Sequence, residues 1–138
     1  MRKLKNLTLV AGGVALGLAA LGFSFAGKAQ APGLAMLANL KKGEWTIRFR
    51  DGSAPRKLCL RSGRELIQIQ HSQPNCSRFV VEDGAATVTV QYTCPGNGYG
   101  RTSIRRETAG LVQIESQGID NGLPFQFAAE ARHTGNCS

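Results

Sequence analysis

Histidines and serines are the residues through which this 138-residue chain could do acid–base or nucleophilic chemistry. His71 and His133 are the only two histidines. A hydrolytic triad needs a nucleophile, a histidine base and an orienting acid, but no G-x-S-x-G turn accompanies Ser72, Ser103 or Ser116. Two histidines without clustered carboxylates also make a poor metal site. The sequence therefore predicts no catalytic, metal or cofactor site, and it places both histidines at exposed loops or strand ends.

Cysteines are the second chemically distinctive set, namely Cys59, Cys76, Cys94 and Cys137. Their number is even and their spacings are 17, 18 and 43 residues, without the Cys-x-x-Cys pairs of zinc knuckles. Spaced cysteines in even number are typical of disulfides in an oxidising compartment. We therefore expect two disulfides.

The N-terminal segment predicts export. Arg2, Lys3 and Lys5 precede an uncharged run over residues 7–26, and small residues follow, as in a secretory signal peptide. We expect residues 1–29 to be removed and residues 30–138 to form a single domain in the periplasm or outside the cell. The 20-residue run is also long enough to span a bilayer, so an uncleaved membrane anchor is the alternative.

Charge argues against nucleic acid as a partner. The net charge of the chain is +8, but four basic residues lie within residues 1–29, which leaves +4 for residues 30–138. A nucleic-acid binder normally carries a clustered basic stripe or a recognisable motif. Six basic residues are expected to be solubilising surface: Lys41, Lys42, Arg56, Lys57, Arg61 and Arg64.

Periodicity predicts the first elements. Residues 32–42 indicate a short helix that ends before Gly43, and residues 43–49 and 56–60 indicate strands. Residues 62–70 allow two interpretations. Ser62 and Glu65 have the capping-box spacing of a helix start, whereas Ile67 and Ile69 alternate as in a strand.

Three hairpins follow, of which the first has the clearest turn. SRFVVE and AATVTVQYT flank Asp83-Gly84, and a two-residue loop there sets Phe79 opposite Val88, with apolar residues meeting on one face. That register places Cys76 opposite Gln91.

The other two hairpins join residues 99–107 to 111–117, and 111–117 to 124–133. Their turns set Ile104 opposite Ile114, and Ile114 opposite Ala129 or Phe127. The predicted fold is all-β with one or two short helices: an antiparallel meander that forms a small curved sheet or half-open barrel, stapled by disulfides.

The hairpin register also favours one cysteine pairing. With Cys76 opposite Gln91, Cys94 lies three places away on the other face, which argues against a Cys76–Cys94 bond unless a bulge intervenes. We therefore expect Cys59–Cys76 and Cys94–Cys137. A strict meander would require the C-terminal tail to fold back to reach Cys94.

Several motifs carry a resemblance to a known family. Gly43-Glu44-Trp45, four spaced cysteines, the terminal Gly135-Asn136-Cys137 and the segment 76–118 resemble the exported proteobacterial family called domain of unknown function 3617. The resemblance implies an exported β domain with paired cysteines, and it implies no activity. Gly43-x-Trp45 also resembles the first strand of lipocalins, but we expect Trp45 to plug the core.

Four arginines form a possible anion-binding strip for lipid headgroups or acidic envelope polymers: Arg48, Arg50, Arg101 and Arg105. Arg101 and Arg105 share one face of their strand, and the register sets Ser103 between them opposite Glu115. Cross-strand ion pairing on a solvated face is the alternative.

These features predict a non-enzymatic periplasmic binding or interaction module. Its partner would be an apolar ligand in a cavity bordered by Trp45, Phe125 and Phe127, or another envelope protein at an uncovered edge strand. One alternative is an envelope enzyme with an unfamiliar site, which requires a histidine near a carboxylate such as Glu130. Another is a structural envelope protein held by an uncleaved N-terminal segment.

Overall fold

A computed structural model describes residues 33–138, so the predicted signal peptide and its cleavage site lie outside the described residues. The described chain forms one short helix, one 3-10 turn and seven strands. Their bounds are α1 Ala35–Ala38, β1 Gly43–Phe49, β2 Arg56–Leu60, η1 Arg64–Leu66, β3 Ser77–Asp83, β4 Thr87–Cys94, β5 Gly98–Thr108, β6 Leu111–Asp120 and β7 Leu123–Gly135. Strands β1 and β2 begin and end where the periodicity predicts them.

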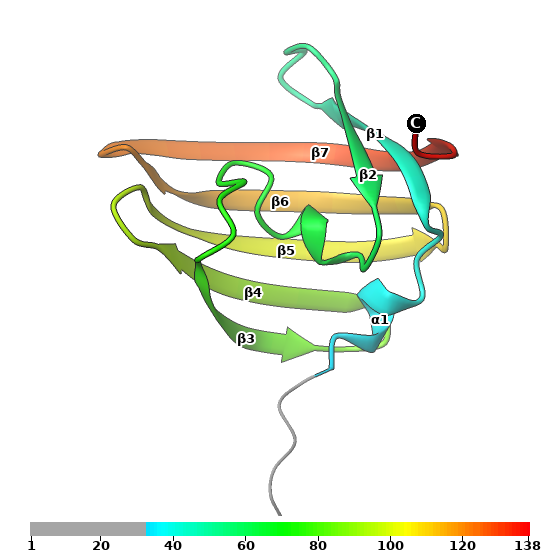
Figure 1. Cartoon of the computed structure of the whole chain (residues 1–138), viewed down its shortest axis with the longest axis horizontal. Helices are drawn as coiled ribbons and strands as arrows, with labels where there is room; N and C mark the ends of the chain where they lie inside the picture. The colour runs from blue at the N-terminus through cyan, green and yellow to red at the C-terminus, as the bar shows by residue number, and fades with distance from the viewer. Residues whose placement is uncertain (1–32) are drawn as a thin grey trace, which may run out of the picture.

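All seven strands belong to one antiparallel sheet with the order β2-β1-β7-β6-β5-β4-β3. The meander from β3 to β7 is extended by the β1–β2 hairpin, because β1 pairs with β7. The sheet does not close, and β2 and β3 are its two edges. Figure 1 shows β2, η1 and α1 in front of the meander strands. The predicted half-open antiparallel fold is therefore confirmed.

The core lies between the sheet and these covering segments. Trp45 is fully buried, with its indole N–H donating to the Lys41 carbonyl at 2.9 Å, which confirms its predicted role as a core plug. Leu37 of α1 and Leu66 of η1 are also fully buried. Within residues 33–138, no helix is long and apolar enough to cross a membrane.

Two of the three predicted hairpin registers are confirmed. Ile104 lies opposite Ile114, and Ile114 lies opposite Ala129. The β6–β7 turn consists of Asn121 and Gly122, both with positive φ (49° and 81°), which is the geometry that suits the twist of a two-residue hairpin.

The register predicted for the first hairpin is wrong. Its turn spans four residues, with Asp83 opposite Val88, and the register shifts again at Val81 in a β-bulge. Val80 therefore takes the core-facing position opposite Val90, and Phe79 is 68% exposed. The bulge adds one unpaired residue to the edge strand and reverses the facing of its neighbours.

The predicted disulfide pairing is wrong for the same reason. Cys76 is bonded to Cys94 and Cys59 to Cys137, with Cα–Cα distances of 4.2 and 5.5 Å. The shifted register brings Cys76 opposite Cys94, and the pairing of β1 with β7 brings the chain end close to β2. Two disulfides are typical of an oxidising, extracytoplasmic compartment.

Residues 62–70 form a turn of 3-10 helix at Arg64–Leu66, so the helical interpretation is correct in kind and the helix is shorter than predicted. The Glu65 carboxylate accepts hydrogen bonds from the backbone N–H groups of Arg61 and Ser62. Burial raises the pKa of Glu65, but hydrogen bonds from the backbone of Glu65 itself, from the backbone of Ser62 and Arg61 and from the Ser62 hydroxyl together outweigh it and hold the pKa below its ordinary value. Glu65, the only acidic residue in residues 62–70, is therefore used to bind backbone N–H groups at the start of η1.

Candidate functional site

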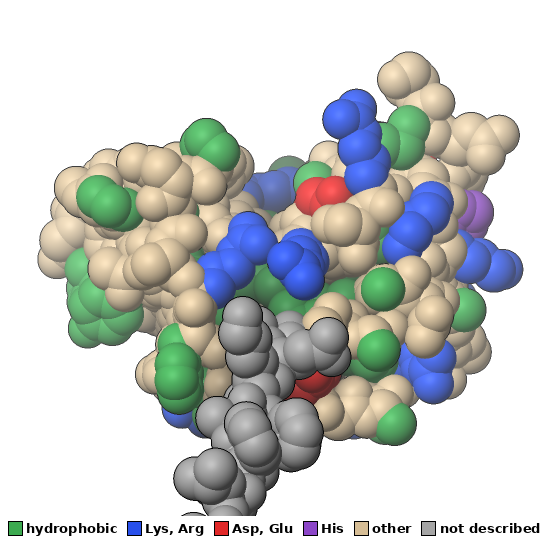
Figure 2. All heavy atoms as spheres, turned by 60° about the horizontal axis from the view of Figure 1, so that its bottom comes forward, with side chains coloured by type: hydrophobic (Ala, Val, Ile, Leu, Met, Phe, Trp, Pro, Cys, Tyr) green, Lys and Arg blue, Asp and Glu red, His purple; other side chains and the backbone are tan. Residues whose placement is uncertain are grey.

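The two edges of the sheet, β2 and β3, are joined by residues 61–76, which cross in front of the sheet. Between these segments lies a cavity of about 420 Å³, lined by residues of β1, β2, β3 and the connecting segment. We call it the edge cavity. Figure 2 shows Lys and Arg side chains gathered around a hydrophobic hollow. The volume of the edge cavity falls within the range of small-ligand pockets, roughly 300–1,000 Å³.

The floor of the edge cavity is apolar. Ile47 of β1 is 1% exposed, and Leu58 of β2 and Ile69 are half-buried against the core. Their positions follow from strand alternation, because Ile47 and Leu58 project toward the same side of the sheet as Trp45. Aliphatic floors of this kind bind the hydrocarbon part of a ligand by excluding water.

The rim of the edge cavity is basic: Arg56, Lys57, Arg64 and Arg78. Lys57 pairs with Glu44 at 3.0 Å. The Arg56 guanidinium lies 5.4 Å from the centroid of the Phe49 ring and donates to the Ile69 carbonyl at 3.3 Å. In the part of the chain that the structure describes, no carboxylate forms a salt bridge with the three arginines.

Arg78 is held in place by a buried glutamine. Gln68 is 6% exposed, and its amide nitrogen donates to the carbonyls of His71 and Gln73. This leaves its amide oxygen to accept a 2.6 Å bond from Arg78 Nε. Burial, followed by the nearby charge of Arg64, lowers the pKa of Arg78. The nearby charge of Glu65 acts in the opposite direction, so two guanidinium groups and one carboxylate face the same cavity.

A second cavity, of about 430 Å³, lies on the β7 side of Arg56. Its lining residues include Phe49, Phe125 and Phe127. The rings of Phe49 and Phe127 pack edge to face, with centroids 5.3 Å apart. Phe125 and Phe127 thus border a cavity, as predicted, but Trp45 is fully buried and lies away from it. Arg56 lines both cavities.

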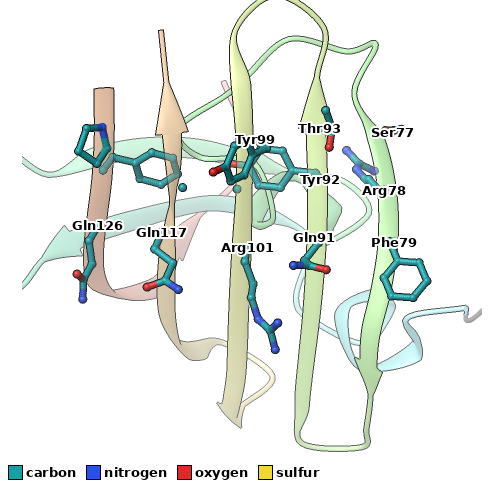
Figure 3. Close-up of a pocket in the computed structure, with 14 residues that line it drawn as sticks. Ser77, Arg78, Phe79, Gln91, Tyr92, Thr93, Tyr99, Arg101, Gln117 and Gln126 are labelled. Atoms are coloured by element: carbon teal, nitrogen blue, oxygen red, sulfur yellow. The ribbon is translucent and has the colours of Figure 1, made fainter. Parts of the chain in front are cut away.

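The opposite face of the sheet, away from α1 and η1, carries a shallow open groove of about 880 Å³. Adjacent strands place Gln91, Arg101, Gln117 and Gln126 side by side in register, with the exposed ring of Phe79 at the end of the row (Figure 3). We call it the outer groove. Its lining holds three glutamines, several aromatic rings and two guanidinium groups, those of Arg101 and Arg78, and Arg78 borders the edge cavity as well.

The four arginines of the predicted anion strip all lie on this outer face. Arg48, Glu130, Gln113 and Arg105 follow one another in register across four strands. Arg105 also pairs with Glu107 at 3.2 Å. Acids are thus interspersed among these arginines, and the strip stays a prediction.

His71 is buried, so its predicted exposed position is wrong. Its Nδ1 lies 2.9 Å from the Tyr92 hydroxyl, and its Nε2 lies 3.2 Å from the Asn97 carbonyl and 3.6 Å from Asp120. The ring sits beside Tyr92 and Phe125, with centroids 5.4 and 5.6 Å away. Both ring nitrogens already have protein partners.

His133 is half-buried and packs edge-on against Trp45, with its Nε2 3.2 Å from the Lys42 carbonyl. Glu130, the carboxylate considered as a histidine partner, instead bonds Arg132 and Gln113. The hydrogen bond from Arg132, followed by that from Gln113, lowers the pKa of Glu130. The histidine–carboxylate pair in this structure is therefore His71 with Asp120.

Tyr92 gives the histidine site a pH dependence that can be measured. Burial, and then the charge of Asp120, raise the pKa of Tyr92 to about 12. The unfolded chain releases this proton near pH 10, so the stabilisation is present below pH 10 and is lost as pH rises toward 12. We expect the wild type to lose about 2 kcal/mol more stability than Tyr92→Phe between pH 9 and pH 11.5. Urea unfolding at pH 9 and pH 11.5 measures the difference, and parallel losses in both proteins would contradict it.

Sequence reasoning missed the edge cavity because it assigned Arg56, Lys57 and Arg64 to solubilising surface. The sequence did contain a signal for a basic site, namely the high density of basic residues: residues 56–64 hold four basic side chains, and Arg78 follows on the next strand. Because Arg56 and Arg78 lie far apart along the chain, the sequence does not show that they line the same cavity. No family model, curated protein or solved structure matches this chain.

Proposed function

We propose that this domain is an extracytoplasmic binding module, and that it receives a small ligand in the edge cavity. The observation that supports this most strongly is the open half-barrel, in which a cavity with an aliphatic floor and a basic rim separates two unjoined edge strands. A rim of charged groups over an apolar floor is the usual composition of a ligand site.

The burial of His71 supports a binding role over an enzymatic one. A general base must reach the proton that it removes, but the His71 ring is enclosed by Tyr92 and Phe125 and bonded through both nitrogens. The network around it instead joins the connecting segment to β4 and the β4–β5 turn. His71 therefore acts as a structural residue.

Native mass spectrometry of the exported protein tests the proposal. We expect a mature chain that begins at Gln30, is four hydrogen atoms lighter than its reduced form and carries a small-molecule adduct. Ser72→Trp places a bulky ring at an exposed position of the edge cavity and should abolish the adduct. Thr93→Trp, in the outer groove, is the matched control and should retain it.

The possible contrary results are distinct. Loss of the adduct in Thr93→Trp alone would move the ligand to the outer groove, and a bare wild-type chain would overturn the proposal. An unprocessed N-terminus would instead support the membrane-anchored alternative. The family resemblance stays a prediction.

A second candidate is a protein partner at β3. Phe79 and Val81 on this edge strand are 68% and 41% exposed, and an open edge can pair with a strand of another chain. The bulge at Val81 and the charged Glu82 and Asp83 limit such pairing to part of the strand. Bare protein that appears as dimers in the same spectra would favour this candidate.

A further inference from the structure

We propose that the ligand of the edge cavity is an amphiphilic anion, an alkyl chain with a phosphate or carboxylate head that Arg56, Arg64 and Arg78 bind. This inference rests on the proposed function, because it names the ligand class for the same cavity.

Charge is the first argument. Three arginines line the cavity, and the described chain offers them no salt-bridge partner. Glu65, which also lines it, is already occupied by the N–H groups of Arg61 and Ser62. A bound oxyanion would relieve the repulsion between Arg64 and Arg78, which an uncharged ligand would leave in place.

Orientation is the second argument. Gln68 is buried and fixed by two backbone carbonyls, and it accepts only the Nε donor of Arg78. The two terminal nitrogens of Arg78 make no hydrogen bond within residues 33–138. A guanidinium held by one edge presents its remaining donors as a fork, which suits bidentate binding of phosphate or carboxylate.

The floor is the third argument, and it separates an amphiphile from a free anion. Ile47, Leu58 and Ile69 offer no polar side-chain group to a ligand, so a free phosphate would leave them in contact with water. An alkyl chain covers them. Because Arg56 also borders the phenylalanine-lined cavity, a longer chain can continue along its aliphatic stem.

Titration calorimetry with decyl phosphate, below its critical micelle concentration, tests this inference. We expect Arg78→Gln and Arg64→Gln each to weaken binding by about tenfold or more, since a charge-assisted hydrogen bond is lost. Arg101→Gln makes the same charge change in the outer groove and should leave the affinity within about twofold. Arg64 is exposed, so Arg64→Gln should keep the wild-type melting temperature, whereas Arg78→Gln also removes the bond from Arg78 Nε to Gln68 and should lower it slightly. Weaker binding by Arg64→Gln therefore reports the lost charge and not a loss of stability.

Three probes separate the possible ligands. Decanoate should bind through the same arginines, whereas inorganic phosphate and decyltrimethylammonium should bind far more weakly than decyl phosphate. Equal affinity for inorganic phosphate would overturn the role of the alkyl chain. Equal affinity for the cationic amphiphile, or equal weakening by Arg101→Gln and Arg78→Gln, would overturn specific anion binding. A neutral adduct that Ser72→Trp abolishes would overturn this inference while leaving the proposed function intact.

Discussion

Replacing both Cys59 and Cys137 by serine is expected to lower the free energy of unfolding by about 4–5 kcal/mol. The bond links residues 78 apart in sequence, and a bridge that closes so long a loop removes much entropy from the unfolded chain. It also ties the C-terminal tail to β2 across β1, where Glu44 pairs with Cys59 on one side and Gly135 on the other. Urea unfolding of the oxidised variant measures the loss.

The second disulfide is the matched control for this prediction. Cys76 and Cys94 are only 18 residues apart, so replacing both by serine should cost about 3 kcal/mol. Equal losses in the two double variants, or a larger loss for Cys76 and Cys94, would contradict the loop-length argument. Peptide mapping of the unreduced wild type checks the pairing itself.

Gly100→Ala is expected to destabilise the domain by about 2–3 kcal/mol, although it adds a single methyl group. In register, Tyr92, Gly100, Gly118 and Phe125 lie side by side on the core face of four adjacent strands. A Cβ at Gly100 would overlap the ring and hydroxyl of Tyr92, which lies across the glycine to reach His71. Overpacking a closed core site carries a cost of this size. Thermal and urea unfolding measure the change.

Two controls identify the clash as the cause. Gly96→Ala lies in the β4–β5 turn, where a Cβ would meet no atom within 4 Å but φ is 83°, so its cost should be only about 1 kcal/mol. In a Tyr92→Leu background, Gly100→Ala should lose most of its effect because the overlapping ring is gone. A full-sized loss in that background would contradict the explanation.

The histidine network accounts for the glycine content of this region. The rings of Tyr92 and Phe125 lie over the two glycines, and the His71 ring packs beside both rings. His71, Gln68 and Arg78 are connected through backbone and side-chain bonds of the same segment. Packing around His71 therefore also positions the arginine that we place at the edge cavity.

Local patterns in the sequence determined the strands, the turns between the later ones and the burial of Trp45. Alternation over residues 43–49 and 56–60 matched β1 and β2, because the two-residue period depends only on near neighbours. Asn121-Gly122 was one of the two loops that the sequence allowed between β6 and β7, and it forms the turn because both residues readily adopt positive φ. Ser62 and Glu65 indicated the start of η1 by their spacing.

Only the tertiary structure decided the features that depend on which strand pairs with which, and in what register. The pairing of β1 with β7 brought Cys137 to Cys59, and the bulge at Val81 brought Cys76 to Cys94. Neither a long-range strand pairing nor a shift in register changes the pattern of apolar residues in the sequence. A shift of one residue nevertheless moves every side chain of the strand to the opposite face of the sheet. The burial of His71 and the meeting of Arg56 with Arg78 have the same origin. The sequence by itself determined a disulfide-bonded β domain, and only the closing of distant segments over the sheet created its candidate site.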